Sequence, residues 1–185
     1  MGWISVLAII GCVFIVWVIL YNRLITLSNL TKNAWHQIEV QLERRADLIP
    51  NLVETVKGYA AHEREAFENI SKARAIFSQA GDMNQKAEAT NMLTAALKSL
   101  FAVAENYPEL KANQNFLKLQ GELSGIESRI AYERESFNDA VLLYNNTQQM
   151  FPFSVVAYLS GFTPRYYFEV NEPLKRRTPE VELGK

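Results

Sequence analysis

The sequence predicts an all-α protein in which an N-terminal transmembrane helix is followed by an antiparallel up-and-down four-helix bundle. Three observations predict this class. The first 22 residues contain no charged side chain. Beyond them, apolar residues recur three or four positions apart, which is the period of an amphipathic helix. Glycine and proline are scarce between residues 20 and 150, where alanine, leucine, glutamate, asparagine and lysine dominate, a composition typical of helices.

The length and net charge of the chain limit the classes of protein to which it can belong. A chain of 185 residues with a net charge of -1 and a pI near 6.2 fits one domain with an attached segment. The tight basic cluster Lys175-Arg176-Arg177 is interpreted as a solvated flank of the tail, and no motif indicates a nucleic-acid partner. Cys12 is the single cysteine, so an intramolecular disulfide and a cysteine metal cluster are excluded. We divide the chain into a transmembrane anchor (1–22), a bundle (23–150), an apolar C-terminal segment (151–170) and a tail expected to be disordered (171–185).

The anchor is predicted from length and from its aromatic ends. Eighteen almost continuously apolar residues, Trp3 to Leu20, make a helix of ~27 Å, close to the ~30 Å of a bilayer core. Trp3, Trp17 and Tyr21 stand near its ends, where aromatic side chains favour the membrane interface. A cleaved signal peptide fits less well, because no Lys or Arg precedes the apolar run and no small-residue cleavage site follows it.

Two further features of this segment concern processing and orientation. Ile9-Ile10-Gly11-Cys12 resembles a bacterial lipobox, but cleavage there would leave a strongly apolar terminus, and a basic leader is missing. We therefore expect an uncleaved anchor without lipid on Cys12. Because Arg23 and Lys32 follow the span and no cation precedes it, the positive-inside rule favours a single-pass protein whose amino terminus lies outside and whose bundle lies in the cytoplasm.

Four periodic stretches predict the bundle helices. The first stretch has Leu24, Leu27, Ala34, Ile38 and Leu42 on one face, and the second has Leu52, Val56, Tyr59, Ala66, Ile70, Ala73 and Phe77. Gly81 should end the second helix, and Asp82 with Gln85 resembles a capping box for the third. The third face comprises Leu93, Ala96, Leu100, Val103 and Tyr107, before Pro108 stops the helix. In the fourth, Phe116, Leu123, Ile130, Phe137 and Tyr144 stand seven residues apart, which suits packing against antiparallel neighbours.

Two interpretations fit the boundary between the first two helices. Asp47 can cap a helix that begins near Ile49, and Pro50 is tolerated in a first helical turn. Residues 46–50 are therefore predicted to form the first turn of the bundle. The alternative is one continuous helix with a kink at Pro50.

The same region carries a resemblance to a known family. The shared phrase runs from Asp47 through Leu48-Ile49-Pro50-Asn51-Leu52 to Tyr59-Ala60, preceded by Ala34-Trp35, Gln41-Leu42 and Arg44-Arg45 and followed by His62-Glu63 and Ala73-Arg74. Later matches are Tyr107-Pro108, Leu110-Lys111-Ala112, Asn115-Phe116, Leu119-Gln120, Tyr144-Asn145, Phe151-Pro152 and Gly161-Phe162. Over roughly residues 20 to 170 the chain resembles the bacterial LemA proteins. His36 and Phe137 depart from the pattern.

This resemblance implies an N-terminal anchor in the bacterial plasma (inner) membrane and an antiparallel four-helix bundle, and it brings no catalytic residues. The residues themselves agree. A di-iron bundle requires Glu-x-x-His motifs, but Asn33 and Tyr59 precede the two histidines by three positions. The zinc-protease pattern fails as well, because Ala66 replaces its second histidine. We therefore expect no enzyme and no cofactor.

A set of polar residues on the fourth helix is the main candidate site. At 100° per residue they project to one side of that helix: Gln120, Glu127, Arg134, Asn138 and Asn145. They form either a polar border or a buried hydrogen-bonded ladder that fixes the register of helices or subunits. The expected partners of a ladder are Arg44, Arg45, Asp47, Asn51 and Glu63.

The apolar C-terminal segment is an interface candidate. It is too short to span a bilayer, and its large side chains are Phe151, Phe153, Val156, Tyr158, Leu159 and Phe162. It could cover the end of the bundle, dock a neighbour or lie at the membrane surface. The expected function is a membrane-anchored scaffold that forms homo-oligomers. The alternative is an adaptor for another membrane protein, such as a stress-related membrane protease.

Overall fold

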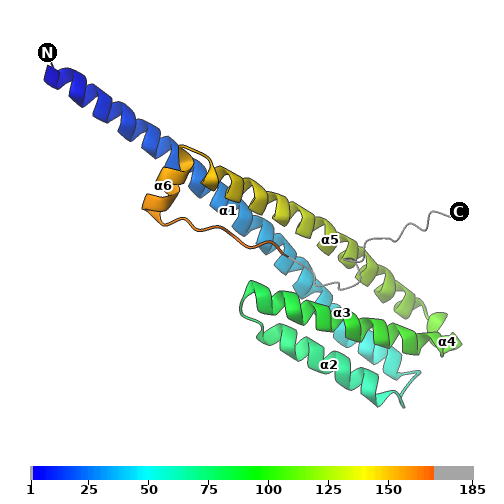
Figure 1. The fold of residues 1–185 in the computed structure, drawn as a ribbon. Helices are drawn as coiled ribbons and strands as arrows, with labels where there is room; N and C mark the ends of the chain where they lie inside the picture. The colour runs from blue at the N-terminus through cyan, green and yellow to red at the C-terminus, as the bar shows by residue number, and fades with distance from the viewer. Residues whose placement is uncertain (1, 169–185) are drawn as a thin grey trace, which may run out of the picture.

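The computed structural model describes residues 2–168, which hold six helices and no strand (Figure 1). They are α1 (Gly2–Lys57), α2 (Arg64–Gln79), α3 (Met83–Glu105), α4 (Pro108–Lys111), α5 (Gln114–Gln149) and α6 (Phe153–Ser160). The all-α class is therefore confirmed. The tail predicted to be disordered (171–185) lies outside the described residues.

The turn predicted at residues 46–50 is wrong, because α1 runs without interruption through Pro50 to Lys57. A proline inside a helix leaves the carbonyl four residues earlier without its usual amide donor. Here that carbonyl belongs to Ala46, and Arg74 of α2 donates to it from Nε at 3.2 Å. An arginine from the neighbouring helix thus replaces the missing backbone hydrogen bond, and the helix continues.

The first loop lies further along the chain, between Lys57 and Arg64. The second periodic stretch therefore belongs to two helices, since Leu52 and Val56 are on α1 whereas Ala66, Ile70, Ala73 and Phe77 are on α2. Its 3–4 spacing continued by coincidence across the loop. The start of α3 and its end before Pro108 agree with the sequence, whereas the short α4 was not predicted. The Asp82 carboxylate accepts from the Gln85 amide at 2.8 Å, and α3 ends before Pro108.

The longest helices pair along much of their length. In Figure 1, α5 runs antiparallel beside α1, and the α2–α3 hairpin lies against the half of the pair remote from the amino terminus. The 36 residues of α5 reach ~54 Å, close to the ~52 Å of α1 beyond residue 22. With 16 and 23 residues, α2 and α3 are too short to accompany the whole pair.

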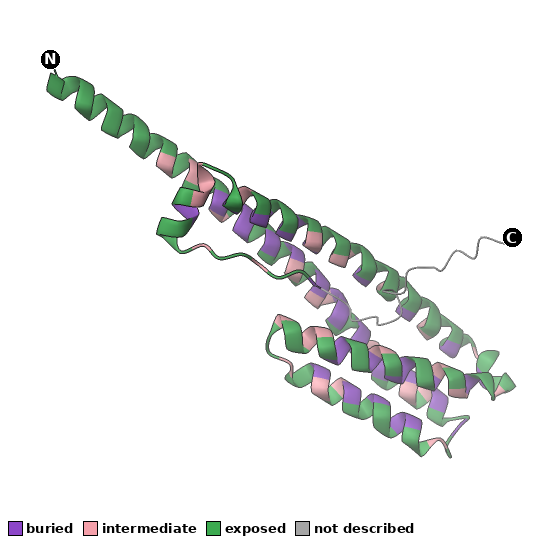
Figure 2. Ribbon diagram, in the orientation of Figure 1, coloured by how far each residue is buried: buried purple, intermediate pink, exposed green. Residues whose placement is uncertain are grey.

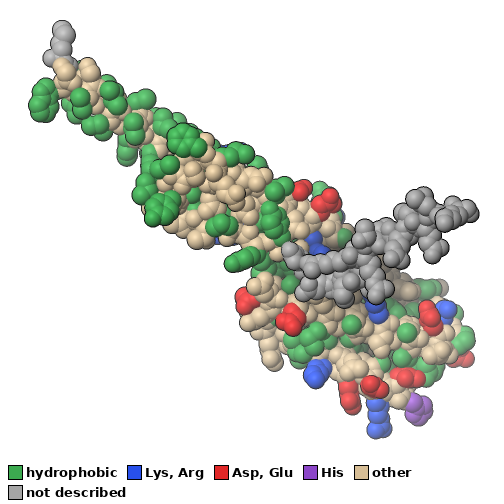
Figure 3. Space-filling view, viewed as in Figure 1, with side chains coloured by type: hydrophobic (Ala, Val, Ile, Leu, Met, Phe, Trp, Pro, Cys, Tyr) green, Lys and Arg blue, Asp and Glu red, His purple; other side chains and the backbone are tan. Residues whose placement is uncertain are grey.

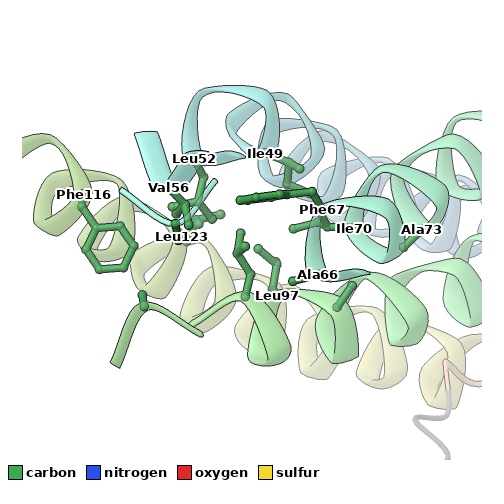
Figure 4. Packing of buried hydrophobic residues seen from close by; sticks show 14 of the residues in the cluster. Ile49, Leu52, Val56, Ala66, Phe67, Ile70, Ala73, Leu97, Phe116 and Leu123 are labelled. Carbon is green, nitrogen blue, oxygen red and sulfur yellow. The ribbon is translucent and has the colours of Figure 1, made fainter. Parts of the chain in front are cut away.

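The apolar core follows this arrangement. Its larger cluster takes buried side chains from α1, α2, α3, α4 and α5, including Leu52, Phe67, Leu97 and Leu123 (Figure 4). A second cluster around Ile38, Ile130 and Phe137 continues toward the amino-terminal half. All five heptad residues predicted on the fourth helix are buried. In contrast, the first turns of α1 are exposed on every side (Figure 2).

Candidate functional site

The most extensively built polar site holds an extended segment, residues 161–168, which we call the C-terminal strap. Two asparagines of α5 each form hydrogen bonds with both the backbone N–H and the backbone C=O of one strap residue. The Asn145 side chain donates to the carbonyl of Arg165 and accepts its amide, both at 2.9 Å. The Asn138 side chain donates to the carbonyl of Phe168 at 3.3 Å and accepts its amide at 2.9 Å. Side-chain amides therefore replace the partner strand that an extended backbone would need.

The spacing of these residues explains why two asparagines can act together. Seven residues of α-helix advance ~10.5 Å, and three residues of extended chain advance ~10 Å. Asn138 and Asn145 are seven apart on α5, while Arg165 and Phe168 are three apart on the strap. The heptad of the helix thus sets the register of the strap.

Further contacts fasten the strap to both long helices. On α5, Gln148 donates to the carbonyl of Phe162 at 2.7 Å, and the Tyr144 hydroxyl donates to that of Thr163 at 3.1 Å. Toward α1, Arg165 donates to the Ser28 hydroxyl at 3.0 Å. Burial raises the pKa of Tyr144, and the nearby Arg165 guanidinium opposes that rise. The strap therefore links α1 to α5.

The end of the strap is held by aromatic contacts. The buried Phe168 ring lies 5.7 Å from that of Trp35 between centroids. The guanidinium of Arg134 lies 5.0 Å from the centroid of the Phe168 ring, a cation–π arrangement. Three predicted polar residues, Arg134, Asn138 and Asn145, are thus gathered around the strap.

A second polar contact joins the buried Arg45 of α1 to a half-exposed carboxylate of α5. Arg45 is only 5% exposed, and its Nη1 lies 2.8 Å from a carboxylate oxygen of Glu127 and donates to the Thr94 hydroxyl at 3.0 Å. Burial lowers the pKa of Arg45, and the Glu127 charge counteracts it. The structure therefore brings together two of the predicted polar residues.

The remaining predicted polar residues lie on the surface. Arg44, Asp47, Asn51 and Gln120 are exposed, and Glu63 accepts a hydrogen bond from Tyr107 at 3.2 Å. Arg44 and Asp47 line an open hollow of about 600 Å³ with Glu122 and Arg129 of α5. This hollow between α1 and α5, which we call the charged groove, carries two cations and two anions.

Apolar residues of α1 and α6 pack together at the point where the exposed start of α1 ends. Val156 and Ala157 of α6 are buried against Leu24, with Trp17, Leu20, Phe153 and Phe162 around them. The Tyr21 and Phe162 rings lie 5.8 Å apart between centroids. Trp3 is exposed near the start of α1, whereas Phe151, Tyr158 and Leu159 are exposed on or beside α6.

The geometry offers no evident reaction centre in the part of the chain that the structure describes. Residues 2–168 contain no group of three or more His, Cys, Asp and Glu side chains suited to a metal ion. His36 contacts Glu39 through Nδ1 at 3.6 Å, and Cys12 lies exposed within the apolar segment of α1. The polar atoms of the site instead hold backbone groups and neighbouring helices.

Sequence reasoning missed the strap and the Arg74–Ala46 contact. The sequence left the asparagines either on a polar border or in a ladder against another helix or subunit, because helix periodicity gives no information about an extended partner. Their seven-residue separation was the available signal. For Arg74, the signal was Pro50 itself, since a proline in a helix requires a substitute donor for one carbonyl.

Known proteins resemble this chain over most of its length. Magnetosome protein MamQ 2 of Paramagnetospirillum magneticum is 28% identical over 193 aligned residues, covering 90% of this chain and 70% of that protein. MamQ of Magnetospirillum gryphiswaldense is 27% identical, covering 89% and 70%. Protein LemA of Metamycoplasma hominis is 26% identical, covering 80% and 68%. These relatives and the apolar start of α1 fit a membrane protein.

The profile of the LemA family matches residues 34–183, a range that contains the Arg45–Glu127 pair, the asparagines that grip the strap and the charged groove. The match covers most of the chain and confirms the resemblance drawn over roughly residues 20 to 170. The chain therefore belongs to the LemA family.

Proposed function

We propose that this protein is a non-enzymatic, membrane-anchored scaffold that self-associates through its charged groove. Its apolar start of α1 crosses the bacterial plasma membrane once, and the remaining helices form an unequal four-helix bundle on the cytoplasmic side. A window of 18 residues in α1 has a mean hydropathy of 2.8 and is 0% buried, which supports the anchor. Arg23 and Lys32 beyond the span support the orientation.

The exposure of Arg44 and Asp47, at the start of the region shared with the LemA proteins, is the observation that supports self-association. Arg44 and Asp47 are neither core residues nor ion-paired within residues 2–168, yet they sit on a long helix beside Glu122 and Arg129. A two-fold contact between identical chains brings the same patch together twice, so it favours a patch with both charge signs. Arg44 of one chain would then face Asp47 of the other.

Mixing charge-reversal variants tests this contact in full-length protein in mild detergent. Arg44→Glu and Asp47→Arg alone should each oppose like charges and shift the protein toward monomer. Mixed together, they should assemble, because both cross-contacts then join opposite charges. Lys72→Glu, a reversal at an exposed site on α2, is the control and should behave as wild type.

Other outcomes would count against the proposal. Assemblies that survive both reversals place self-association elsewhere. A monomeric wild-type protein that copurifies with one distinct membrane protein would reject the scaffold and favour the adaptor hypothesis.

A further inference from the structure

An apolar surface on and beside α6 is left uncovered at the end of the exposed segment of α1. Phe151 and Tyr158 are 83% and 86% exposed, and Val155 and Leu159 are also exposed. The opposite face of α6 is packed on Leu24 of α1. The short helix therefore has two apolar faces, of which the protein covers one.

This surface is continuous with the apolar segment of α1. Trp17 and Leu20 pack against α6, and Ile15, Val18 and Ile19 remain exposed on the turns beside that contact. In Figure 3, hydrophobic side chains gather on the amino-terminal half of the molecule, and charged side chains gather toward the half that carries α2 and α3. If the membrane boundary lies at residue 22, the end of the predicted span, then α6 lies directly beside that boundary.

The charge distribution favours lipid over water at this end. Residues 140–164 contain no Asp, Glu, Lys, Arg or His, and Arg23 is the single charged residue among residues 1–31. The two chain segments that meet here therefore carry almost no charge to desolvate. Tyr158, Tyr21 and Trp17 are side chains that favour the interface between headgroups and acyl chains.

The backbone of α6 is also compatible with a shallow position in the membrane. Helix ends ordinarily leave polar groups that need a partner, which is costly away from water. At the start, Ser154 and Val155 donate to the carbonyls of Met150 and Pro152 at 2.9 and 3.3 Å. At the end, Phe162 donates to the carbonyl of Ala157 at 3.0 Å, across the left-handed Gly161 (φ 73°). Several terminal groups are thus satisfied internally.

We propose that α6 is a second membrane-contacting element, lying in the interface of the bilayer with Phe151, Val155, Tyr158 and Leu159 toward the lipid. This inference rests on the proposed anchor, because α6 reaches the bilayer only if the start of α1 crosses it. The bundle is then held to the membrane at two places, by the span and by the apolar end of the α5–α6 turn. An interfacial helix of this kind buries its apolar face ~5–10 Å into the headgroup and acyl boundary.

Site-directed spin labelling of the full chain tests the proposal. With Cys12→Ser removing the single native cysteine, one label is placed by Val13→Cys, Tyr158→Cys, Leu159→Cys or Tyr132→Cys. Each protein is reconstituted into vesicles of phosphatidylcholine and phosphatidylglycerol. Collision with apolar oxygen and with a water-soluble nickel chelate is then measured. All four positions are exposed, so differences report the surroundings.

We expect labels at 158 and 159 to favour oxygen, as the label at 13 does, but less strongly, whereas the label at 132 on α5 favours the nickel chelate. Nickel-favouring labels at 158 and 159 beside an oxygen-favouring label at 13 overturn the inference and leave the anchor intact. A nickel-favouring label at 13 overturns the anchor itself. Labels at 158 and 159 shielded from both reagents, with broadening that disappears on dilution into unlabelled protein, show that a second copy covers α6 instead.

Discussion

Arg74 donates a hydrogen bond to the carbonyl of Ala46, the backbone oxygen that Pro50 deprives of its helical donor. Removing this substitute donor should leave the carbonyl unsatisfied. We expect Arg74→Ala to lower the free energy of unfolding by ~1–3 kcal/mol. Chemical denaturation of the full chain in detergent measures it.

The Arg74–Ala46 contact also predicts that the stability effects of substitutions at Arg74 and Pro50 are not additive. Pro50→Ala restores an amide at that position, so Arg74→Ala should cost clearly less in the Pro50→Ala background than in the wild type. Arg64→Ala, a truncation at an exposed site of α2, should cost little in either. Equal costs of Arg74→Ala in both backgrounds would show that the contact does not serve the proline.

The protection of the strap from amide exchange should depend on Asn145 far more than on the adjacent Asn146. Asn145→Ala removes both hydrogen bonds to Arg165, and the loss of ~1–3 kcal/mol should accelerate amide exchange there about 5- to 150-fold. Hydrogen–deuterium exchange with mass spectrometry measures the strap peptide. Asn146→Ala, on the exposed side of α5, is the matched control. Unchanged protection in Asn145→Ala would mean that other contacts hold the strap.

Stability should respond differently to the loss of Glu127 and to the loss of Arg45, because Arg45 is buried and the Glu127 side chain is half-exposed. Glu127→Ala leaves a buried guanidinium without its counter-charge and should lower stability by ~1–3 kcal/mol. Adding Arg45→Met removes the buried charge and should recover part of the loss. Denaturation midpoints compare the variants, with Glu135→Ala as the exposed control. A double variant less stable than Glu127→Ala would contradict this account.

Stability should also carry an acid-dependent contribution from Glu39. Burial raises the pKa of this carboxyl, but the Lys86 ammonium 2.6 Å away and His36 outweigh that effect and hold it below its ordinary value. A depressed folded-state pKa gives stability that is present above the unfolded value of about 4.3 and lost as the pH falls through the lower folded value. Glu39→Gln should therefore cost about 1 kcal/mol near neutral pH, and less in acid.

Denaturation series at several pH values measure that difference. Glu43→Gln, at an exposed site on the same helix, should change stability little throughout. A Glu39→Gln deficit that grew toward acid would reverse the sign of the argument.

Orientation in the membrane can be tested by proteolysis of spheroplasts. If the bundle is cytoplasmic, external trypsin should leave the Lys and Arg sites beyond residue 23 uncut until the cells are lysed. A cytoplasmic and an external marker protein serve as controls. Cleavage within α2 or α3 before lysis would place the bundle outside.

Sequence periodicity predicted what depends on local spacing. The heptad from Phe116 to Tyr144 identified five buried side chains, and Asp82 with Gln85 identified a helix start, because both features are read within one helix. Periodicity did not predict that the helix continues through Pro50, because the Arg74 side chain that replaces the missing hydrogen bond comes from another helix. It also failed at Asn138 and Asn145, whose partner is an extended segment more than 15 residues away. Contacts between separate segments leave no period in a single sequence.

The uninterrupted course of α1 has a mechanical consequence. No loop separates its apolar start from its packed half, so a helix anchored as proposed would act as a lever whose fulcrum lies in the bilayer. An arm of ~52 Å tilted by ~20° displaces its far end by roughly 18 Å. Changes in bilayer thickness that alter the tilt would then reach the α2–α3 hairpin as motion parallel to the membrane plane.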